Sequence, residues 1–134
     1  MLQNLEQVFP DYQDKALTPA GLVKQNDEGK RYDRFRDRLI FPTRDARHRL
    51  IGFGARALKP DDEPKYLNTP QTPLFDKSGN LYGLDRAADS CRRLDQAVVV
   101  EGYMDVVALA QHGVGYAVAT LGTATTPVHV PKLL

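Results

Sequence analysis

The chain has 134 residues, of which 42% are apolar and 26% charged, a composition that is ordinary for a folded globular domain and excludes disorder as the default. Its apolar runs are too short for a membrane-spanning helix and its N-terminus lacks a secretion signal, so we expect a cytoplasmic protein without a membrane partner. Cys91 is the single cysteine, which excludes an internal disulfide and a multi-cysteine zinc site within this sequence.

Positive charge is concentrated in one stretch of the chain. Residues 30–59 contain ten Lys or Arg and only three Asp, a net charge of +7, whereas the whole chain carries +1. For any single arginine of this stretch, solvation of the surface is the simpler explanation. For the cluster as a whole, we predict a groove that binds a polyanion such as a nucleic acid.

The first half of the chain predicts short helices and β-hairpins. Apolar side chains at residues 2–8 are spaced for one face of a short helix, and a polar turn at residues 26–29 predicts a small hairpin. Residues 38–58 predict two longer strands joined by a turn at residues 44–48. The prolines between residues 59 and 73 exclude a helix there and predict an ordered loop.

The second of the longer strands has two different faces. Alternation places Gly52, Gly54 and Arg56 on one face, whereas Ala55 points to the packed face. Because glycine lets a ligand approach the backbone and arginine offers a bidentate fork, we expect the glycine face to be open for contact with phosphate.

The second half of the chain predicts alternating helices and strands. A helix is expected at residues 85–93, a strand buried on both faces at 97–100, a helix at 103–111 and a second buried strand at 116–119. Strand, helix and strand in this order indicate a parallel βαβ unit, and Thr126 with the following proline suits the start of another helix. The predicted fold class is therefore α/β, with an α+β first part that contains a β-hairpin.

Two acidic residues flank the start of the helix at residues 103–111. Glu101 follows the first parallel strand, at the edge where open α/β sheets bind ligands, and Asp105 lies in the first helical turn. Both carboxylates can reach one hard divalent cation. On spacing alone, however, the favourable electrostatics of an Asp at a helix N-terminus explain Asp105 equally simply and remain the more common reason for such a pair.

A series of motifs in this sequence resembles the central motifs of bacterial DnaG-type replicative primases, over roughly residues 30 to 126. In chain order they are Tyr32-Asp33-Arg34-Phe35-Arg36-Asp37-Arg38, Phe41-Pro42, Ile51-Gly52-Phe53-Gly54-Ala55-Arg56, Pro64-Lys65-Tyr66-Leu67-Asn68-Thr69-Pro70, Leu81-Tyr82-Gly83-Leu84, Val100-Glu101-Gly102-Tyr103-Met104-Asp105-Val106 and Ala119-Thr120-Leu121-Gly122-Thr123-Ala124. The family has a glycine where this chain has Ala55 and often a histidine where it has Asp76.

The resemblance implies an RNA polymerase domain that makes short RNA primers on single-stranded DNA, with Mg²⁺ or Mn²⁺ in a TOPRIM fold. Residues 1–75 would be the C-terminal part of the basic, nucleic-acid-binding N-terminal subdomain, and residues 76–134 the opening of the TOPRIM subdomain. Glu101 matches the essential catalytic glutamate and, with Asp105, would bind the metal. The residues expected to contact nucleic acid are Arg56, Lys65, Asn68 and Lys77 by resemblance, and Arg34 as a member of the basic stretch.

The resemblance also implies partners and a limit on activity. The expected partners are a single-stranded DNA template, an RNA primer, ribonucleoside triphosphates and, through a domain absent from this sequence, the replicative helicase at the nucleoid. No Asp or Glu follows Asp105, so the later Asp-x-Asp pair that two-metal chemistry needs is missing and we expect this chain alone to be inactive.

Two other functions stay open from the sequence. The first is another TOPRIM enzyme, such as a topoisomerase or a nuclease, against which the Pro64-Lys65-Tyr66 loop argues. The second is a non-catalytic module that binds single-stranded nucleic acid.

Overall fold

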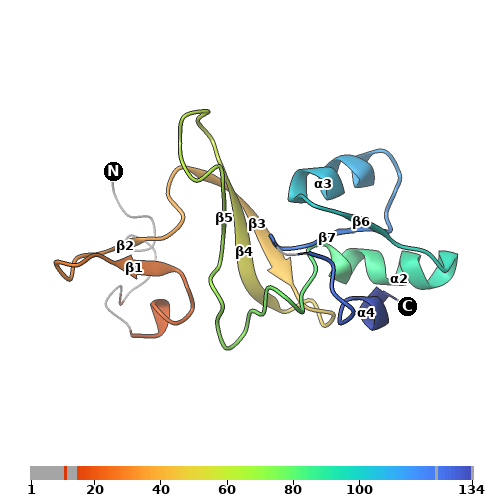
Figure 1. Ribbon diagram of the computed structural model, residues 1–134, viewed down its shortest axis with the longest axis horizontal. Helices are drawn as coiled ribbons and strands as arrows, with labels where there is room; N and C mark the ends of the chain where they lie inside the picture. Colours follow the sequence, from red (N-terminus) through yellow and green to blue (C-terminus); the bar gives the residue numbers. More distant parts are fainter. Residues whose placement is uncertain (1–10, 12–14, 123, 134) are drawn as a thin grey trace.

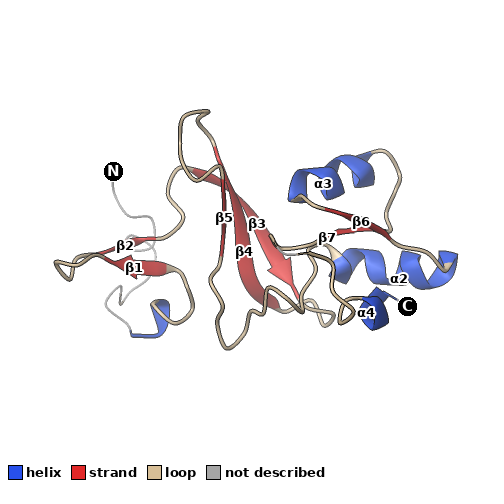
Figure 2. Ribbon diagram, viewed as in Figure 1, coloured by secondary structure: helices blue, strands red, loops and turns tan. Residues whose placement is uncertain are grey.

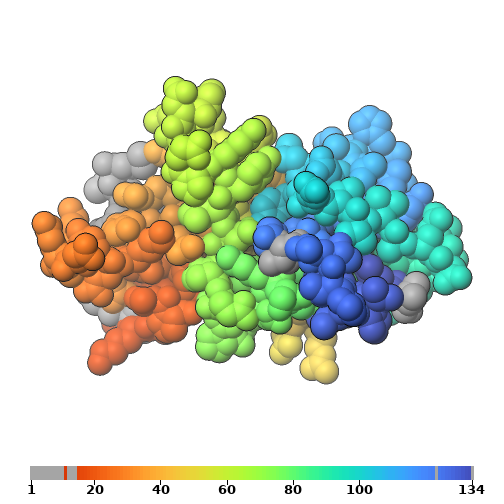
Figure 3. Space-filling model, in the orientation of Figure 1, coloured from red at the N-terminus to blue at the C-terminus, as the bar shows by residue number. Residues whose placement is uncertain are grey.

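Three small sheets follow one another along the chain in the computed structural model, which describes residues 11, 15–122 and 124–133. A short 3-10 helix, η1 (Lys15–Leu17), precedes the antiparallel hairpin of β1 (Val23–Gln25) and β2 (Arg31–Asp33). This hairpin lies on one side of a central antiparallel sheet, and the helices with the parallel strands lie on the other, an order that the colours of the space-filling view also show (Figures 1, 2 and 3). The short helix predicted at residues 2–8 lies outside the described residues.

The central sheet has the strand order β3-β4-β5, with both pairs antiparallel. Its strands are β3 (Arg38–Arg44), β4 (Leu50–Ala57) and β5 (Tyr66–Asn68). The first two agree with the sequence prediction. The third is a three-residue strand within the proline-rich segment, where the sequence predicted only a loop, and it pairs with the last part of β4.

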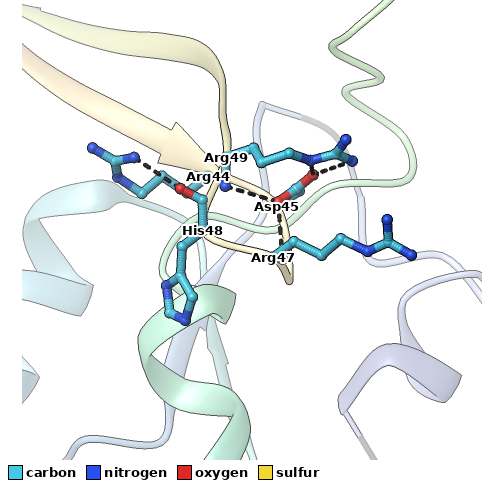
Figure 4. A network of polar contacts seen from close by, with 5 residues as sticks. All are labelled: Arg44, Asp45, Arg47, His48 and Arg49. Atoms are coloured by element: carbon cyan, nitrogen blue, oxygen red, sulfur yellow. Dashed lines mark hydrogen bonds and ion pairs between the residues drawn. The ribbon is translucent and has the colours of Figure 1, made fainter.

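Asp45 organises the turn between β3 and β4 (Figure 4). Its carboxylate accepts backbone N–H groups of Arg47 and Arg49 at 2.9 and 3.0 Å, and it also pairs with the Arg49 guanidinium. His48 has a positive φ of 60°, a backbone conformation that histidine adopts more readily than most other non-glycine residues. One acid therefore shapes a turn that carries several cationic side chains, and Figure 4 shows the Arg44 guanidinium on the opposite side from those of Arg47 and Arg49.

The parallel unit follows the predicted order of helix, strand, helix and strand. It comprises α2 (Leu84–Leu94), β6 (Val98–Val100), α3 (Tyr103–Gln111) and β7 (Ala117–Ala119), followed by α4 (Val130–Leu133). β6 and β7 pair in parallel, and Tyr82 makes an isolated antiparallel bridge to Ala119. Among the described helices, none has the length and apolar character that crossing a membrane would need.

The prediction that β6 is buried on both faces was wrong. Val99 is 37% exposed, and Val98 and Val100 are only partly buried. Within the described residues β6 has a hydrogen-bonded neighbour on one side only, because its sheet contains β7 and no other strand. β7, by contrast, is buried at all three positions, as predicted.

The glycine face of β4 is covered rather than open. A Cβ on Gly52 would lie 2.8 Å from the Phe75 ring, and one on Gly54 would lie 2.3 Å from the Tyr103 ring. Phe75, Tyr103, Phe41 and Leu121 form one buried cluster. The glycines therefore allow Phe75, from the loop after β5, and Tyr103, from α3, to pack against the central sheet, which corrects the expectation of bare backbone for phosphate contact.

We expect Gly54→Ala to lower the free energy of unfolding by about 1–3 kcal/mol, because an added methyl group overpacks the contact with Tyr103. Urea unfolding monitored by circular dichroism measures the change. Gly115→Ala is the matched control, since its Cβ would meet only Ser90 Oγ at 3.8 Å. Equal midpoints for the two variants would contradict the packing role of Gly54.

Candidate functional site

Glu101 and Asp105 line one cavity of about 350 Å³, together with Tyr66 and Asn68 of β5. Glu101 directly follows β6, and Asp105 lies in the first turn of α3. Both carboxylates belong to exposed residues, so they are accessible to ions from solvent. The cavity therefore lies between the parallel unit and the edge strand of the central sheet.

Local structure at the start of α3 brings the two acids to the same place. Gly102 is the N-cap residue, with an extended backbone at φ −121° and ψ 152°, and a Cβ added to it would lie 3.0 Å from Asp105 Oδ2. The Asp105 carboxylate thus folds back over the backbone of Gly102, next to Glu101. The partial positive charge of a helix N-terminus favours an acid at this position.

Asn68 connects β5 to the loop that follows β7. Its Nδ2 donates to the carbonyl of Leu121 at 3.4 Å, and its backbone carbonyl accepts hydrogen bonds from Arg34 Nε and Nη2 at 3.3 and 3.2 Å. Its Oδ1 is buried and has no hydrogen-bond partner among the described residues. Asn68 thus has a buried acceptor with unused hydrogen-bonding capacity, in a residue that lines the same cavity as the two carboxylates.

A second cavity, of about 570 Å³, lies on the other face of β5 and is rich in cations. Leu67 lines this basic cavity whereas its neighbours Tyr66 and Asn68 line the acidic one, as alternation along a strand requires. The basic side chains that line it are Lys24, Lys30, Arg34, Arg36 and Arg38. β5 is consequently the wall between a basic cavity and an acidic cavity.

Three arginines of the basic cavity are held by different contacts. Arg34 binds the Asn68 carbonyl, and burial lowers the pKa of its guanidinium from the usual value. Arg36 lies 4.7 Å from the centre of the Tyr32 ring, a cation–π contact, and Arg38 donates to the Pro64 carbonyl at 2.6 Å. These contacts orient the three guanidinium groups around the cavity.

The structure brings together only some of the residues that the sequence predicted for the site. Asn68, Glu101 and Asp105 share the acidic cavity, whereas Arg34 lies in the basic one. Arg56 is the cross-strand partner of Tyr66, so its side chain leaves the sheet on the same face as Tyr66. Lys65 is exposed just before β5.

Lys77 lies apart from both cavities, in the loop before α2. Its backbone N–H donates to Gln71 Oε1 at 3.3 Å, and neither cavity includes it.

Sequence reasoning did not single out two further residues of the acidic cavity, Thr120 and Gly122. Both follow β7, and Glu101 follows the parallel strand β6. Because carboxyl ends of parallel strands meet at one sheet edge, their position after a predicted strand was a usable signal.

The donor atoms of the acidic cavity suit a hard divalent cation. The carboxylates of Glu101 and Asp105 offer oxygen ligands, which Mg²⁺ and Mn²⁺ prefer over nitrogen or sulfur, and Asn68, which lines the same cavity, has a buried amide oxygen without a hydrogen-bond partner. The described residues contain no group of three or more His, Cys, Asp or Glu placed to hold a metal. The residues present would therefore supply only part of a coordination sphere, and their chemistry fits an oxygen-bound metal.

Two protein-family models match the chain, one in each half. The first, the N-terminal domain of the DNA primase catalytic core, matches residues 2–88, and the second, the Toprim domain, matches residues 95–133. The chain belongs to the DnaG-type DNA primase family. The DNA primase of Neisseria meningitidis serogroup B is 57% identical over 132 residues, and that of Pseudomonas aeruginosa is 60% identical over 120 residues.

Solved primase structures have the same fold as this chain. A crystal structure of a DNA primase domain from Pseudomonas aeruginosa matches 98% of the chain with a TM-score of 0.88 at 56% identity. A DnaG primase catalytic domain bound to ssDNA matches 97% with a TM-score of 0.85 at 50% identity. The chain covers 41% of each of these two structures. It spans 22% of the length of the Neisseria primase and 18% of the length of the Pseudomonas aeruginosa primase.

We expect Thr69→Val to destabilise β5 in this chain. Thr69 is buried, and its Oγ1 accepts the backbone N–H of Phe53 at 2.8 Å, so the valine would leave that donor without a partner. A loss of about 1–3 kcal/mol in the free energy of unfolding should follow. Thr125→Val, at an exposed position, serves as the control in the same urea titration, and equal losses would contradict this role of Thr69.

Proposed function

We propose that the protein to which this chain belongs is a DNA-dependent RNA polymerase that synthesises short RNA primers on single-stranded DNA for replication. The observation that supports this most strongly is that β5 has the carboxylate cavity of Glu101 and Asp105 on one face and the basic cavity on the other. A polyanion and a divalent cation can then bind within a few residues of each other. The names of the matched relatives support the same activity.

In this proposal Glu101 is the catalytic carboxylate and, with Asp105, would hold Mg²⁺ or Mn²⁺. When bound, these cations supply activation of the primer 3′-hydroxyl and stabilisation of the leaving pyrophosphate. The chain's own contribution is to fix two carboxylates at the carboxyl end of β6 and the start of α3, in the cavity that Asn68 also lines. Tyr103 anchors this segment between the two acids, because it is buried against the central sheet.

The same proposal assigns nucleic-acid contacts to Arg34, Arg56, Lys65, Asn68 and Lys77. Arg56 and Lys65 are placed favourably for a strand that passes over β5, since Arg56 shares the face of Tyr66 and Lys65 is exposed beside it. Arginine suits such a position because its planar fork binds phosphate through two hydrogen bonds. The solved DnaG catalytic domain bound to ssDNA agrees with a single-stranded template.

The remaining assignments follow from the family. Ribonucleoside triphosphates and an RNA primer would be further ligands, the replicative helicase would bind through another part of the protein, and the enzyme would work in the bacterial cytoplasm at the nucleoid. We also infer a subdomain boundary close to residue 75, before the loop that leads into α2.

Replacing Arg56 and Lys65 with Ala should weaken binding of this chain to a fluorescent single-stranded DNA. Each lost phosphate contact should also reduce the slope of log affinity against log salt by about 0.7, because fewer counterions are released. Arg93→Ala, an exposed cation in the last turn of α2, is the control and should leave the slope unchanged. A wild-type slope in the double variant would remove both residues from the interface.

Mn²⁺ should bind at the carboxylate cavity and broaden nearby amide signals in the NMR spectrum of the ¹⁵N-labelled chain. The signals of Tyr66, Gly102 and Gly122 should broaden first, since these residues line the cavity. Glu101→Gln with Asp105→Asn should abolish the effect. The control pair, Asp27→Asn with Glu28→Gln, removes two exposed carboxylates from the β1–β2 turn and should preserve it. Broadening that survives the first pair would exclude Glu101 and Asp105 as the metal ligands.

A further inference from the structure

One line of hydrogen bonds crosses β5 from the basic cavity to the carboxylate cavity. Arg34, which lines the basic cavity, donates from Nε and Nη2 to the backbone carbonyl of Asn68. The side chain of Asn68 lines the carboxylate cavity and donates to the carbonyl of Leu121, in the loop after β7. Arg34 therefore reaches the residues around Glu101 through a single intervening residue.

The carbonyl of Asn68 is available to Arg34 because β5 is an edge strand. Hydrogen bonds join Ala57 N to the Lys65 carbonyl and Thr69 N to the Phe53 carbonyl. Hydrogen-bonded and non-bonded pairs alternate along an antiparallel ladder. Asn68, opposite Gly54, belongs to a non-bonded pair, so its backbone N–H and C=O point away from β4 toward the open edge of the sheet. At that edge the guanidinium of Arg34 takes the place of a neighbouring strand.

We propose that Arg34 is a positioning residue that sets the place of Asn68 and of the Leu121–Gly122 loop beside Glu101, and that it couples polyanion binding in the basic cavity to the carboxylate cavity. The coupling rests on the proposed function, whereas the positioning does not. An arginine has five N–H donors, of which Asn68 engages two. The others can bind a phosphate in the basic cavity, so one rigid group would contact nucleic acid and β5 together.

Lysine could not replace Arg34 in this arrangement. Its ammonium is a point charge without a planar fork, so it cannot direct two donors in fixed geometry at one carbonyl and still present others to a phosphate. Arg36 provides the internal comparison, because it lines the same cavity with the same charge but contacts the Tyr32 ring instead of β5.

NMR of the ¹⁵N-labelled chain without DNA tests the positioning. Arg34→Ala should shift the side-chain NH₂ signals of Asn68 and the backbone amide of Gly122, and Arg34→Lys should shift them in the same direction. Arg36→Ala, which removes the same charge from the same cavity, should leave both signals at their wild-type positions. Unmoved signals in Arg34→Ala, or equal shifts in Arg34→Ala and Arg36→Ala, would overturn the proposal. If Arg34→Ala does not fold, the comparison of Arg34→Lys with Arg36→Lys decides by the same criteria.

Titration with a single-stranded DNA oligonucleotide then tests the coupling. In the wild-type chain, DNA should shift the signals of Tyr32 in the basic cavity and of Gly122 in the carboxylate cavity. Gly122 is the readout because Asn68 is itself a proposed nucleic-acid contact. In Arg34→Lys, the shift at Tyr32 should persist while the shift at Gly122 is lost. Retained shifts at both residues would overturn the coupling. A wild-type chain that does not respond to DNA at all would overturn the proposed function instead, and the DNA-free result would still decide the role of Arg34.

Discussion

The contact between the Tyr103 ring and the backbone of Gly54 fixes the relation between the two halves of the chain. Tyr103 stacks on Phe41 with ring centres 5.2 Å apart, and it makes an edge-to-face contact with Tyr82 with ring centres 5.0 Å apart. The central sheet and the loop before α2 therefore contact this ring from several sides. Burial raises the pKa of its phenol, which keeps the ring neutral. Because Glu101 and Asp105 each lie two residues from Tyr103, anchoring this ring places both carboxylates against β5.

β5 shows how a very short strand can organise a site. Its three residues, Tyr66–Asn68, alternate between two cavities of opposite character, and its backbone bonds β4 on one side and Arg34 on the other. A strand of this length has little stability by itself, so it depends on these neighbours. A polyanion bound on one face and a metal bound on the other would thus both contact β5, a short strand that β4 and Arg34 stabilise.

Local patterns predicted most of the elements but not the contacts between them. The helix at residues 103–111 and the strand at 116–119 followed from runs of residue types within one element, and the structure confirms them. β5 was missed because Pro64 and Pro70 suppress any local strand signal, and its pairing with β4 is a long-range interaction. The glycine face of β4 was misread because glycine permits close approach of any group, and the sequence did not reveal that the group is an aromatic ring.

Within the site, the proximity of Glu101 and Asp105 was predictable from spacing, since both positions belong to one strand–helix junction, whereas spacing alone favoured helix electrostatics as the reason for Asp105. The partition of the predicted nucleic-acid contacts between two faces of β5 was not, because it depends on which cavity each side chain enters. The register of β4 with β5 decides this for Arg56 and Asn68, and that register is a property of the folded sheet.

The concentration of charge in residues 30–59 also has a different meaning in the folded chain. Arg34, Arg36 and Arg38 line the basic cavity, the cations of residues 44–49 lie at the turn at the other end of β3, and Arg56 leaves the opposite face of the sheet. Exposed charges separated by more than about 8–10 Å are largely screened at physiological salt, so the +7 does not act as one field. The basic cavity itself also contains Asp37, Asp62 and Glu63. Recognition of a phosphate backbone there must therefore depend on where individual guanidinium groups are held, and the contacts of Arg34, Arg36 and Arg38 orient each of them.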